Sequence, residues 1–323
     1  MGVKKMTDAE FVAAWYEAKC SPVQMSKMTG VSERQIYKTR SSLMERGIAL
    51  QSVPSNGHEP VVTPVSISPR MTYDLNDGVV IVFSDAHYYP GDYPVAHQAL
   101  LKLIKELKPK MVIANGDILD GASISKHERV GWEARPSLKD ELQVVQERMA
   151  EIESVIPKGC LLHRTIGNHD IRFEKRLSAN VPQYEGVAGT RLKDHLPAWN
   201  ESWSLYINPD FEAPTMVKHR PPSQGLHSSY NSTLRAGTNM VCGHLHKLMV
   251  YPWTDYRGRR YGVDTGTLAD WEDSSAFNYA EDDPRPWASG FAVLTFHKGY
   301  MLLPELCQVS EFGAVFRGQV LDL

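Results

Sequence analysis

Cysteine is scarce in this chain of 323 residues, and its four cysteines form no pair at a metal-binding spacing. They are scattered from end to end without a CxxC motif: Cys20, Cys160, Cys242 and Cys307. This pattern excludes a disulfide framework and a zinc–thiolate site, and it is typical of proteins of a reducing cytosol.

Long apolar runs and a strong net charge are missing as well. No run approaches the roughly 20 apolar residues that a membrane span needs. Residues 1–8 are polar, carry two lysines and lack the apolar core of a signal peptide. We therefore expect a cytoplasmic protein without a membrane partner. The formal net charge of −3 neither favours nor excludes an anionic partner.

Residues 1–50 are predicted to form a small all-α domain. Gly30 makes a turn after two short helices, and Ser32 can cap a third, basic helix over Glu33–Arg46. Helix, glycine turn and basic helix form the helix-turn-helix pattern. The run Ser21–Leu43 resembles bacterial and phage helix-turn-helix segments.

The charge of this segment agrees with a nucleic-acid partner. Residues 1–47 contain eight Lys/Arg and five Asp/Glu, an excess of three positive charges. We expect Arg34, Lys38 and Arg40 to contact DNA phosphates. The alternative is a three-helix bundle that packs on another protein or dimerises.

The rest of the chain divides into a linker and a larger domain. Residues 51–71 are rich in Ser, Pro, Val and Asn, which indicates a linker. Residues 72–323 are predicted to form an α/β domain, because buried strands alternate with amphipathic helices and therefore pair in parallel. The predicted elements are strands at 79–83, 111–114 and 161–166 and helices at 95–107 and 137–155. Later short strands at 215–217, 240–242, 261–263 and 291–296 indicate a second, mixed sheet packed on the first.

Five polar motifs each follow a predicted strand. They are Ser84–His87, Asn115–Asp120, Gly167–Asp170, Lys218–Arg220 and Gly243–His246. Strand ends converge on one crevice in α/β proteins, so five loops can supply one site. Carboxylate, imidazole and amide ligands together suit divalent ions such as Mn²⁺, Fe²⁺ or Zn²⁺. One carboxylate can bridge two ions about 3.5–4 Å apart.

The order D-x-H, GDxxD, GNHD, H, GHxH resembles the calcineurin-like metallophosphoesterases over residues 78–295. The resemblance implies an αββα sandwich of two sheets with a dinuclear metal site. It implies that one ion is held by Asp85, His87 and His246, the other by Asn168, His219 and His244, and that Asp117 bridges them. We expect Mn²⁺, with Fe²⁺, Zn²⁺, Ni²⁺ and Mg²⁺ as alternatives.

The resemblance also implies a mechanism. Two dications lower the pKa of a shared water from about 15.7 towards 7, so that a bridging hydroxide attacks phosphorus at neutral pH. His169 would bind no metal and would protonate the leaving oxygen as the general acid, and Asp170 would orient His169. Asp120 is expected to have a structural or outer role.

The fourth motif departs from the family pattern of His followed by Gly. Here Arg220 follows His219, and His227 is a rival ligand. We prefer His219 because it ends the strand-like run Thr215–Lys218. Arg220 is expected to contact the substrate phosphate. Trp203 is expected to pack in the core or a loop rather than to stack on a nucleobase.

We expect a DNA phosphodiesterase, either an endonuclease or an exonuclease. The helix-turn-helix pattern of the N-terminal segment favours this substrate. Residues 266–270 and 286–291 resemble phage-encoded members of the metallophosphoesterase family. A phage-encoded protein would act in the cytoplasm of the bacterial host. The alternatives are a phosphomonoesterase or protein phosphatase, and a DNA-binding regulator with an inactive phosphoesterase domain. The intact ligand set argues against the regulator. A homo-oligomer and a partner ATPase stay open.

Overall fold

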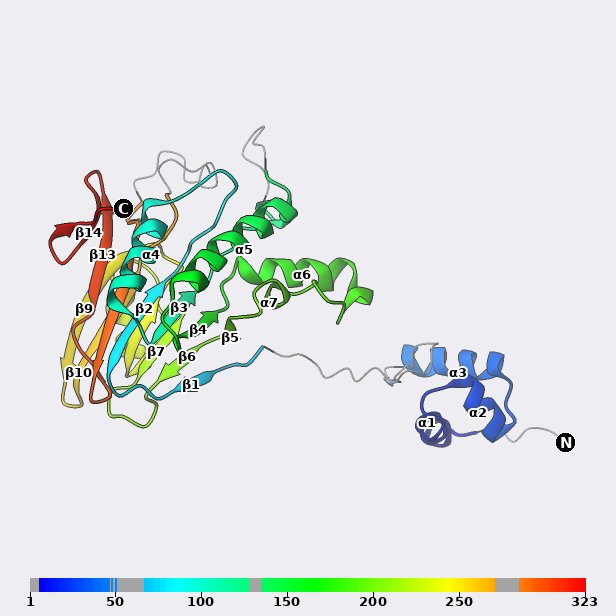
Figure 1. The fold of residues 1–323 in the computed structure, drawn as a ribbon. Helices are drawn as coiled ribbons and strands as arrows, with labels where there is room; N and C mark the ends of the chain where they lie inside the picture. Colours follow the sequence, from blue (N-terminus) through cyan, green and yellow to red (C-terminus); the bar gives the residue numbers. More distant parts are fainter. Residues whose placement is uncertain (1–5, 47, 49, 51–66, 128–134, 271–284) are drawn as a thin grey trace. The chain divides into compact units, whose positions relative to one another are not determined.

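The computed structural model describes residues 6–46, 48, 50, 67–127, 135–270 and 285–323 (Figure 1). The chain divides into two compact units, Met1–Val65 and Ser66–Leu323. Most of the predicted linker, residues 51–66, lies outside the described residues. The first strand of the second unit begins at Met71, which is the last residue of the predicted linker.

The first unit is helical, as predicted. Its helices are α1 (Asp8–Glu17), α2 (Pro22–Thr29) and α3 (Glu33–Glu45). The Ser32 hydroxyl accepts from the Gln35 amide at the start of α3, and Gly30 ends α2 in the left-handed region with a φ of 72°. The helices enclose a small core that includes Trp15 and Ile36. Local capping and turn chemistry therefore set the helix boundaries.

Within the described residues, the second unit contains two sheets (Figure 1). The nine-stranded first sheet has the order β15-β14-β13-β11-β2-β3-β4-β5, with β12 paired to β11, and the six-stranded second sheet has the order β1-β6-β7-β8-β10-β9. The first comprises β2 (Gly78–Phe83), β3 (Met111–Asn115), β4 (Leu161–Thr165), β5 (Asn200–Ser202), β11 (Gly290–His297), β12 (Tyr300–Met301), β13 (Glu305–Ser310), β14 (Gly313–Phe316) and β15 (Gln319–Val320). The second comprises β1 (Met71–Tyr73), β6 (Leu205–Ile207), β7 (Thr215–Lys218), β8 (Asn239–Cys242), β9 (Leu248–Asp255) and β10 (Gly258–Thr265).

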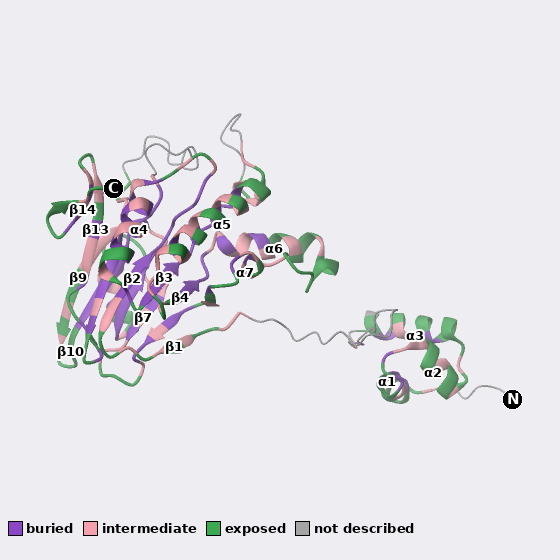
Figure 2. Ribbon diagram, in the orientation of Figure 1, coloured by how far each residue is buried: buried purple, intermediate pink, exposed green. Residues whose placement is uncertain are grey.

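Alternation along β2 shows how the layers are built. Val80 and Val82 point into the core between the sheets, where Val217 and Val241 of the second sheet join them. Ile81 and Phe83 point to the opposite face, which the long helices cover. This is why β2 is apolar on both faces and appears buried in Figure 2.

Helices complete the αββα arrangement. They are α4 (Val95–Leu107), α5 (Leu138–Val155), α6 (Asp170–Asn180), α7 (Leu192–His195) and α8 (Ser228–Ala236). The helices α4 and α5 supply the apolar cover of the first sheet, and α8 packs on β8, β9 and β10 of the second. The predicted α/β class with two sheets is confirmed.

One strand lies in a different sheet from the one predicted. The predicted strand at 291–296 was expected in the second sheet, but β11 pairs antiparallel with β2 in the first. An apolar strand has the same composition in either sheet, because both faces are buried in both places. Only the long-range register, Ala292 against Val82, decides its partner.

Candidate metal centre

The five polar motifs follow the carboxyl ends of β2, β3, β4, β7 and β8. The strands β2, β3 and β4 are mutually parallel, as are β7 and β8. Each sheet therefore delivers its loops to one edge, and the two edges meet. Of the seven side chains predicted as ligands, six fall into adjoining groups whose ligand atoms lie within 4.8 Å of one another: Asp85, His87 and His246 in the first group, and Asp117, His219 and His244 in the second.

The shared carboxylate joins these groups. Asp117 also lies within 4.8 Å of His87 and His169 in a third group of ligand atoms. In the second group, Asp117 Oδ2 is 3.0 Å from His219 Nε2. Asn168, the seventh predicted ligand, has its Oδ1 3.2 Å from the same nitrogen. The arrangement places Asp117 between two sets of ligands, as a bridge requires.

Several donor atoms suit a cation. Asp85 Oδ1 is buried and lies 3.3 Å from His246 Nε2. His219 donates Nδ1–H to the Asn115 carbonyl at 2.8 Å, which leaves Nε2 as a lone-pair donor. Because buried acceptors facing one another are unfavourable without a positive charge between them, these residues fit a divalent metal. Together with the family match below, the groups indicate divalent metal binding.

The backbone at these positions is strained. Among the described residues, eleven other than glycine have positive φ, and five of them are predicted ligands: Asp85, His87, Asp117, His244 and His246. Left-handed backbone at such residues costs of order 1–3 kcal/mol each and persists where the surrounding structure enforces it. Left-handed backbone is concentrated at these ligands, which indicates that the geometry of the site is maintained at a cost in local stability.

Two glycines allow the loops to close around the carboxylates. A Cβ added at Gly167 would lie 2.0 Å from Asp117 Oδ1, and one at Gly243 would lie 2.6 Å from Asp85 Oδ2. Neither glycine has a positive φ. Close approach, and not an unusual turn, is therefore the reason for glycine at both positions.

The carboxylates make the centre electronegative. Burial opposes a charge on His219, but Asp117 and Asp85 outweigh burial and raise the pKa of His219 to about 9. Burial and the neighbouring His219 lower the pKa of His244 to about 4. A proton drawn onto a buried imidazole occupies the place that a metal would take, so protons and metal compete for the same nitrogens.

The role predicted for Asp170 is wrong. Its carboxylate accepts backbone N–H groups from Asp117, Ile118, Leu119 and Gly167 at 3.0–3.3 Å. It is the first residue of α6, and the chain directs it back to the loop after β3 instead of towards His169. Asp170 therefore fixes the loop that carries Asp117.

Asp120 is the carboxylate that orients His169. Its Oδ1 lies 3.1 Å from Nδ1 of His169 and 3.1 Å from Nδ1 of His87. Arg172, which the sequence did not single out, donates to His169 Nε2 at 2.9 Å and to the Asp120 carbonyl at 2.9 Å. Both nitrogens of His169 are thus engaged without a metal. The i, i+3 spacing of His169 and Arg172 on one helical face was the available signal.

The remaining predicted residues lie as follows. His219 is buried in the second group, whereas His227 is exposed before α8, so the geometry favours His219. Arg220 is exposed and donates to Asn168 Oδ1 at 3.2 Å.

In the first unit, Arg34 and Lys38 are exposed on α3. The guanidinium of Arg40 is half-buried and lies 5.4 Å from the centre of the Trp15 ring. None of the helices in the described ranges combines the length and apolar character needed to cross a bilayer.

The chain is similar to one family profile, to two phage proteins and to solved structures. The family profile described as calcineurin-like phosphoesterase matches residues 78–318. The Gene 54 proteins of Mycobacterium phages L5 and D29 are 25% and 24% identical over 246 and 245 residues, which cover 71% of this chain and 93% of each relative. A solved structure of wild-type Vps29 with Zn²⁺ from Entamoeba histolytica is 12% identical, with a TM-score of 0.41, and the match covers 73% of this chain and 96% of that one.

Proposed function

The chain belongs to the calcineurin-like phosphoesterase family, and from that premise we propose that it is a metal-dependent DNA phosphodiesterase. Family membership implies a hydrolase that acts on phosphoester bonds. The observation that carries the proposal is the meeting of two ligand groups, Asp85, His87 and His246 on one side and Asp117, His219 and His244 on the other.

These residues would hold two divalent ions, with Mn²⁺ preferred, and Asn168 would complete the second set. The ions would supply an activated water and positive charge on the phosphate oxygens. Asp117 would fix the spacing between them. Asp170 would maintain that spacing, because its carboxylate binds the amide of Asp117 itself.

His169 would deliver the proton to the leaving oxygen. Asp120 accepts Nδ1–H and so fixes the orientation of the ring. Nε2 is therefore the nitrogen that would transfer the proton, and in the structure it accepts a hydrogen bond from Arg172. Arg172 must therefore release Nε2 when the substrate enters, and Nε2 must take up a proton from water before His169 can protonate the leaving oxygen. A positioned acid of this kind contributes about 10²–10⁴-fold to the rate.

DNA is favoured as the substrate by the first unit. Three capped helices with a glycine turn carry Arg34 and Lys38 on an exposed surface of α3. A helix-turn-helix of this kind would concentrate a phosphodiesterase on DNA through phosphate contacts. The phage relatives are compatible with such a role.

The test uses the full chain loaded with Mn²⁺. Supercoiled plasmid, linear duplex and single-stranded DNA are compared with p-nitrophenyl phosphate and its bis ester. We expect DNA cleavage that EDTA and Asp117→Asn both abolish. Asp210→Asn, which changes an exposed carboxylate in a turn after β6, is the matched control and should cleave normally.

Two results would contradict the proposal. Turnover of the monoester with every form of DNA intact would assign a phosphomonoesterase. DNA binding without turnover of any ester, in protein shown by elemental analysis to hold metal, would assign a regulator.

A further inference from the structure

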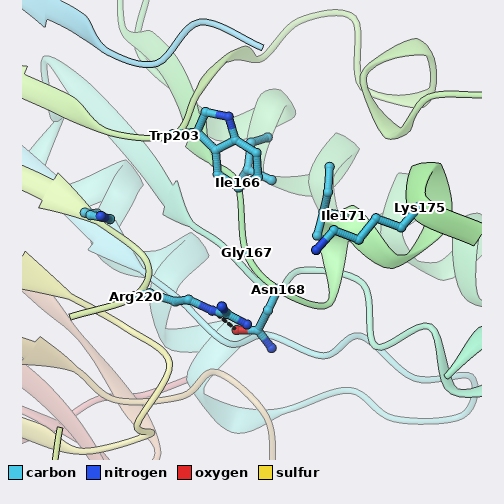
Figure 3. Close-up of a pocket in the computed structure, with 8 residues that line it drawn as sticks. Ile166, Gly167, Asn168, Ile171, Lys175, Trp203 and Arg220 are labelled. Atoms are coloured by element: carbon cyan, nitrogen blue, oxygen red, sulfur yellow. Dashed lines mark hydrogen bonds between the residues drawn. The ribbon is translucent and has the colours of Figure 1, made fainter. Parts of the chain in front are cut away.

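A cavity of about 270 Å³ opens beside the candidate metal centre (Figure 3). It shares Asn168 with that centre. Arg220 and Asn168 lie together on one side, Trp203 lies across from them, and Lys175 reaches towards it from α6. Its volume is near the lower bound of about 300 Å³ for small-molecule pockets, so it fits one small unit of a substrate.

The charged part of the lining is entirely cationic. Lys175, Lys218 and Arg220 line the cavity, and no carboxylate lines it among the described residues. None of these three side chains forms an ion pair within the part of the chain that the structure describes. Three unpaired cations around one hollow attract an anion with several oxygens, such as a phosphate of a polymer backbone.

The apolar part of the lining is aromatic. Trp203 follows β5 and exposes 41% of its surface, beside Ile166 and near Ile171. The sequence predicted that Trp203 packs in the core or in a loop. In the structure it lies directly after β5 and outside the core, whereas Trp199, four residues earlier, is fully buried. An exposed indole in a cationic hollow has the two features that bind unpaired nucleotides, a flat apolar face and nearby positive charge.

We propose that this cavity receives one unpaired nucleotide adjacent to the scissile phosphate. The base stacks on Trp203, and the phosphate of that nucleotide lies among Lys175, Lys218 and Arg220. A base inside a duplex has both faces covered by its neighbours, so the indole is reachable only from a single strand, a flap or a frayed end. The substrate class is therefore DNA with an unpaired nucleotide at the cleavage site. This inference rests on the proposed DNA phosphodiesterase activity.

The experiment compares single-stranded, flapped and intact duplex DNA with bis(p-nitrophenyl) phosphate, using the full chain with Mn²⁺. The readout is the ratio of kcat/KM for the strand to kcat/KM for the bis ester, which cancels changes in the metal centre. Trp203→Ala should lower this ratio about tenfold, mainly through KM, as expected for the loss of one base–aromatic stack. Trp203→Phe should restore most of it.

Matched controls separate the cavity from the rest of the surface. Lys175→Ala should lower the ratio, whereas Lys158→Ala, an exposed lysine before β4, should not. Tyr256→Ala, a fully exposed aromatic in the β9–β10 turn, should leave the ratio unchanged. The wild type should cleave intact duplex more slowly than single strands or flaps.

The outcomes distinguish this inference from the proposed function. If the wild type cleaves DNA but Trp203→Ala keeps the wild-type ratio, or if intact duplex is cut as fast as single strands, the cavity is not a nucleotide site and the nuclease assignment stands. If the wild type cleaves no DNA, both fall. Loss of phosphopeptide turnover in Trp203→Ala with unchanged DNA cleavage would assign the cavity to a peptide instead.

Discussion

Replacing Asp170 with Asn should destabilise the fold more than it disturbs the chemistry directly. The Asp170 carboxylate accepts four backbone amides, two at each oxygen: Asp117 and Gly167 at Oδ2, and Ile118 and Leu119 at Oδ1. The residue is buried, with 2% of its surface exposed. Asp170→Asn keeps the shape of the side chain while it removes one acceptor oxygen and the negative charge.

The expected magnitude follows from counting acceptors. An Asn side chain offers one oxygen, so two of the four amides lose their acceptor and face an NH₂ donor instead. A buried donor left unsatisfied costs about 1–3 kcal/mol. Asp170→Asn should therefore lower the free energy of unfolding by about 2–6 kcal/mol.

The assay is guanidinium denaturation of the metal-free chain, so that metal loss cannot cause the effect. Asp120→Asn is the matched control, since its carboxylate contacts the imidazoles of His87 and His169. Both contacts are made by the same oxygen, Oδ1, and Asn keeps one acceptor oxygen, so metal-free stability should change by no more than about 1 kcal/mol. Asp120→Asn should lower kcat about 10–100-fold, the range for removing a group that orients a metal ligand or its neighbour.

A reversed pattern would refute the assignment of these two carboxylates. If Asp170→Asn unfolds like the wild type but shifts the pH profile of kcat, Asp170 acts through His169. If Asp120→Asn retains wild-type kcat, Asp120 does not orient the acid.

Three further predictions address other parts of the molecule. Gly167→Ala should lower Mn²⁺ affinity at least about tenfold in calorimetric titration, because the added Cβ would lie 2.0 Å from Asp117 Oδ1. Gly159→Ala places a Cβ in open space but in a left-handed backbone with a φ of 83°, so it should lower stability and still bind Mn²⁺ normally. Burial raises the pKa of Glu141 from 4.5 to about 7. Between these pH values the folded state holds a proton that the unfolded chain has released, so the free energy of unfolding should fall by about 3 kcal/mol from pH 4.5 to 7. Urea titrations of Glu141→Gln should lack this decline. Arg34→Ala with Lys38→Ala should weaken DNA binding and reduce the slope of log K against log salt by about 2, whereas an unchanged slope would assign the three helices to protein contacts.

The parts of the fold that follow from neighbouring residues were predictable. The first strand of the parallel sheet, the long helices and the caps of α2 and α3 depend on periodicity and turn chemistry within a short window. The ligand motifs were also local, since each comes directly after a strand. Parallel pairing then brings their ends together without further information.

Features set by contacts distant in sequence were not predictable. The partner of β11 depends on register with a strand about 200 residues away. Asp170 directly follows His169 in sequence, and Asp120 belongs to the motif after β3. Only the path of the chain into α6 decides which carboxylate contacts the imidazole of His169. Trp199 and Trp203 are chemically identical, yet one is enclosed and the other is open, because burial depends on what the rest of the chain places above each ring.

The centre exists only where the two sheets meet, and this links its chemistry to the core between them. Asp85 follows a strand of the first sheet, and its Oδ2 accepts the amide of His244 from the second at 2.8 Å. His219 of the second sheet in turn donates to the carbonyl of Asn115 in the first at 2.8 Å. Each ligand group therefore contains residues from both sheets. A change in the packing of Val82 against Val241 would move the two halves of each group relative to one another, and interiors are dense enough to transmit such a shift.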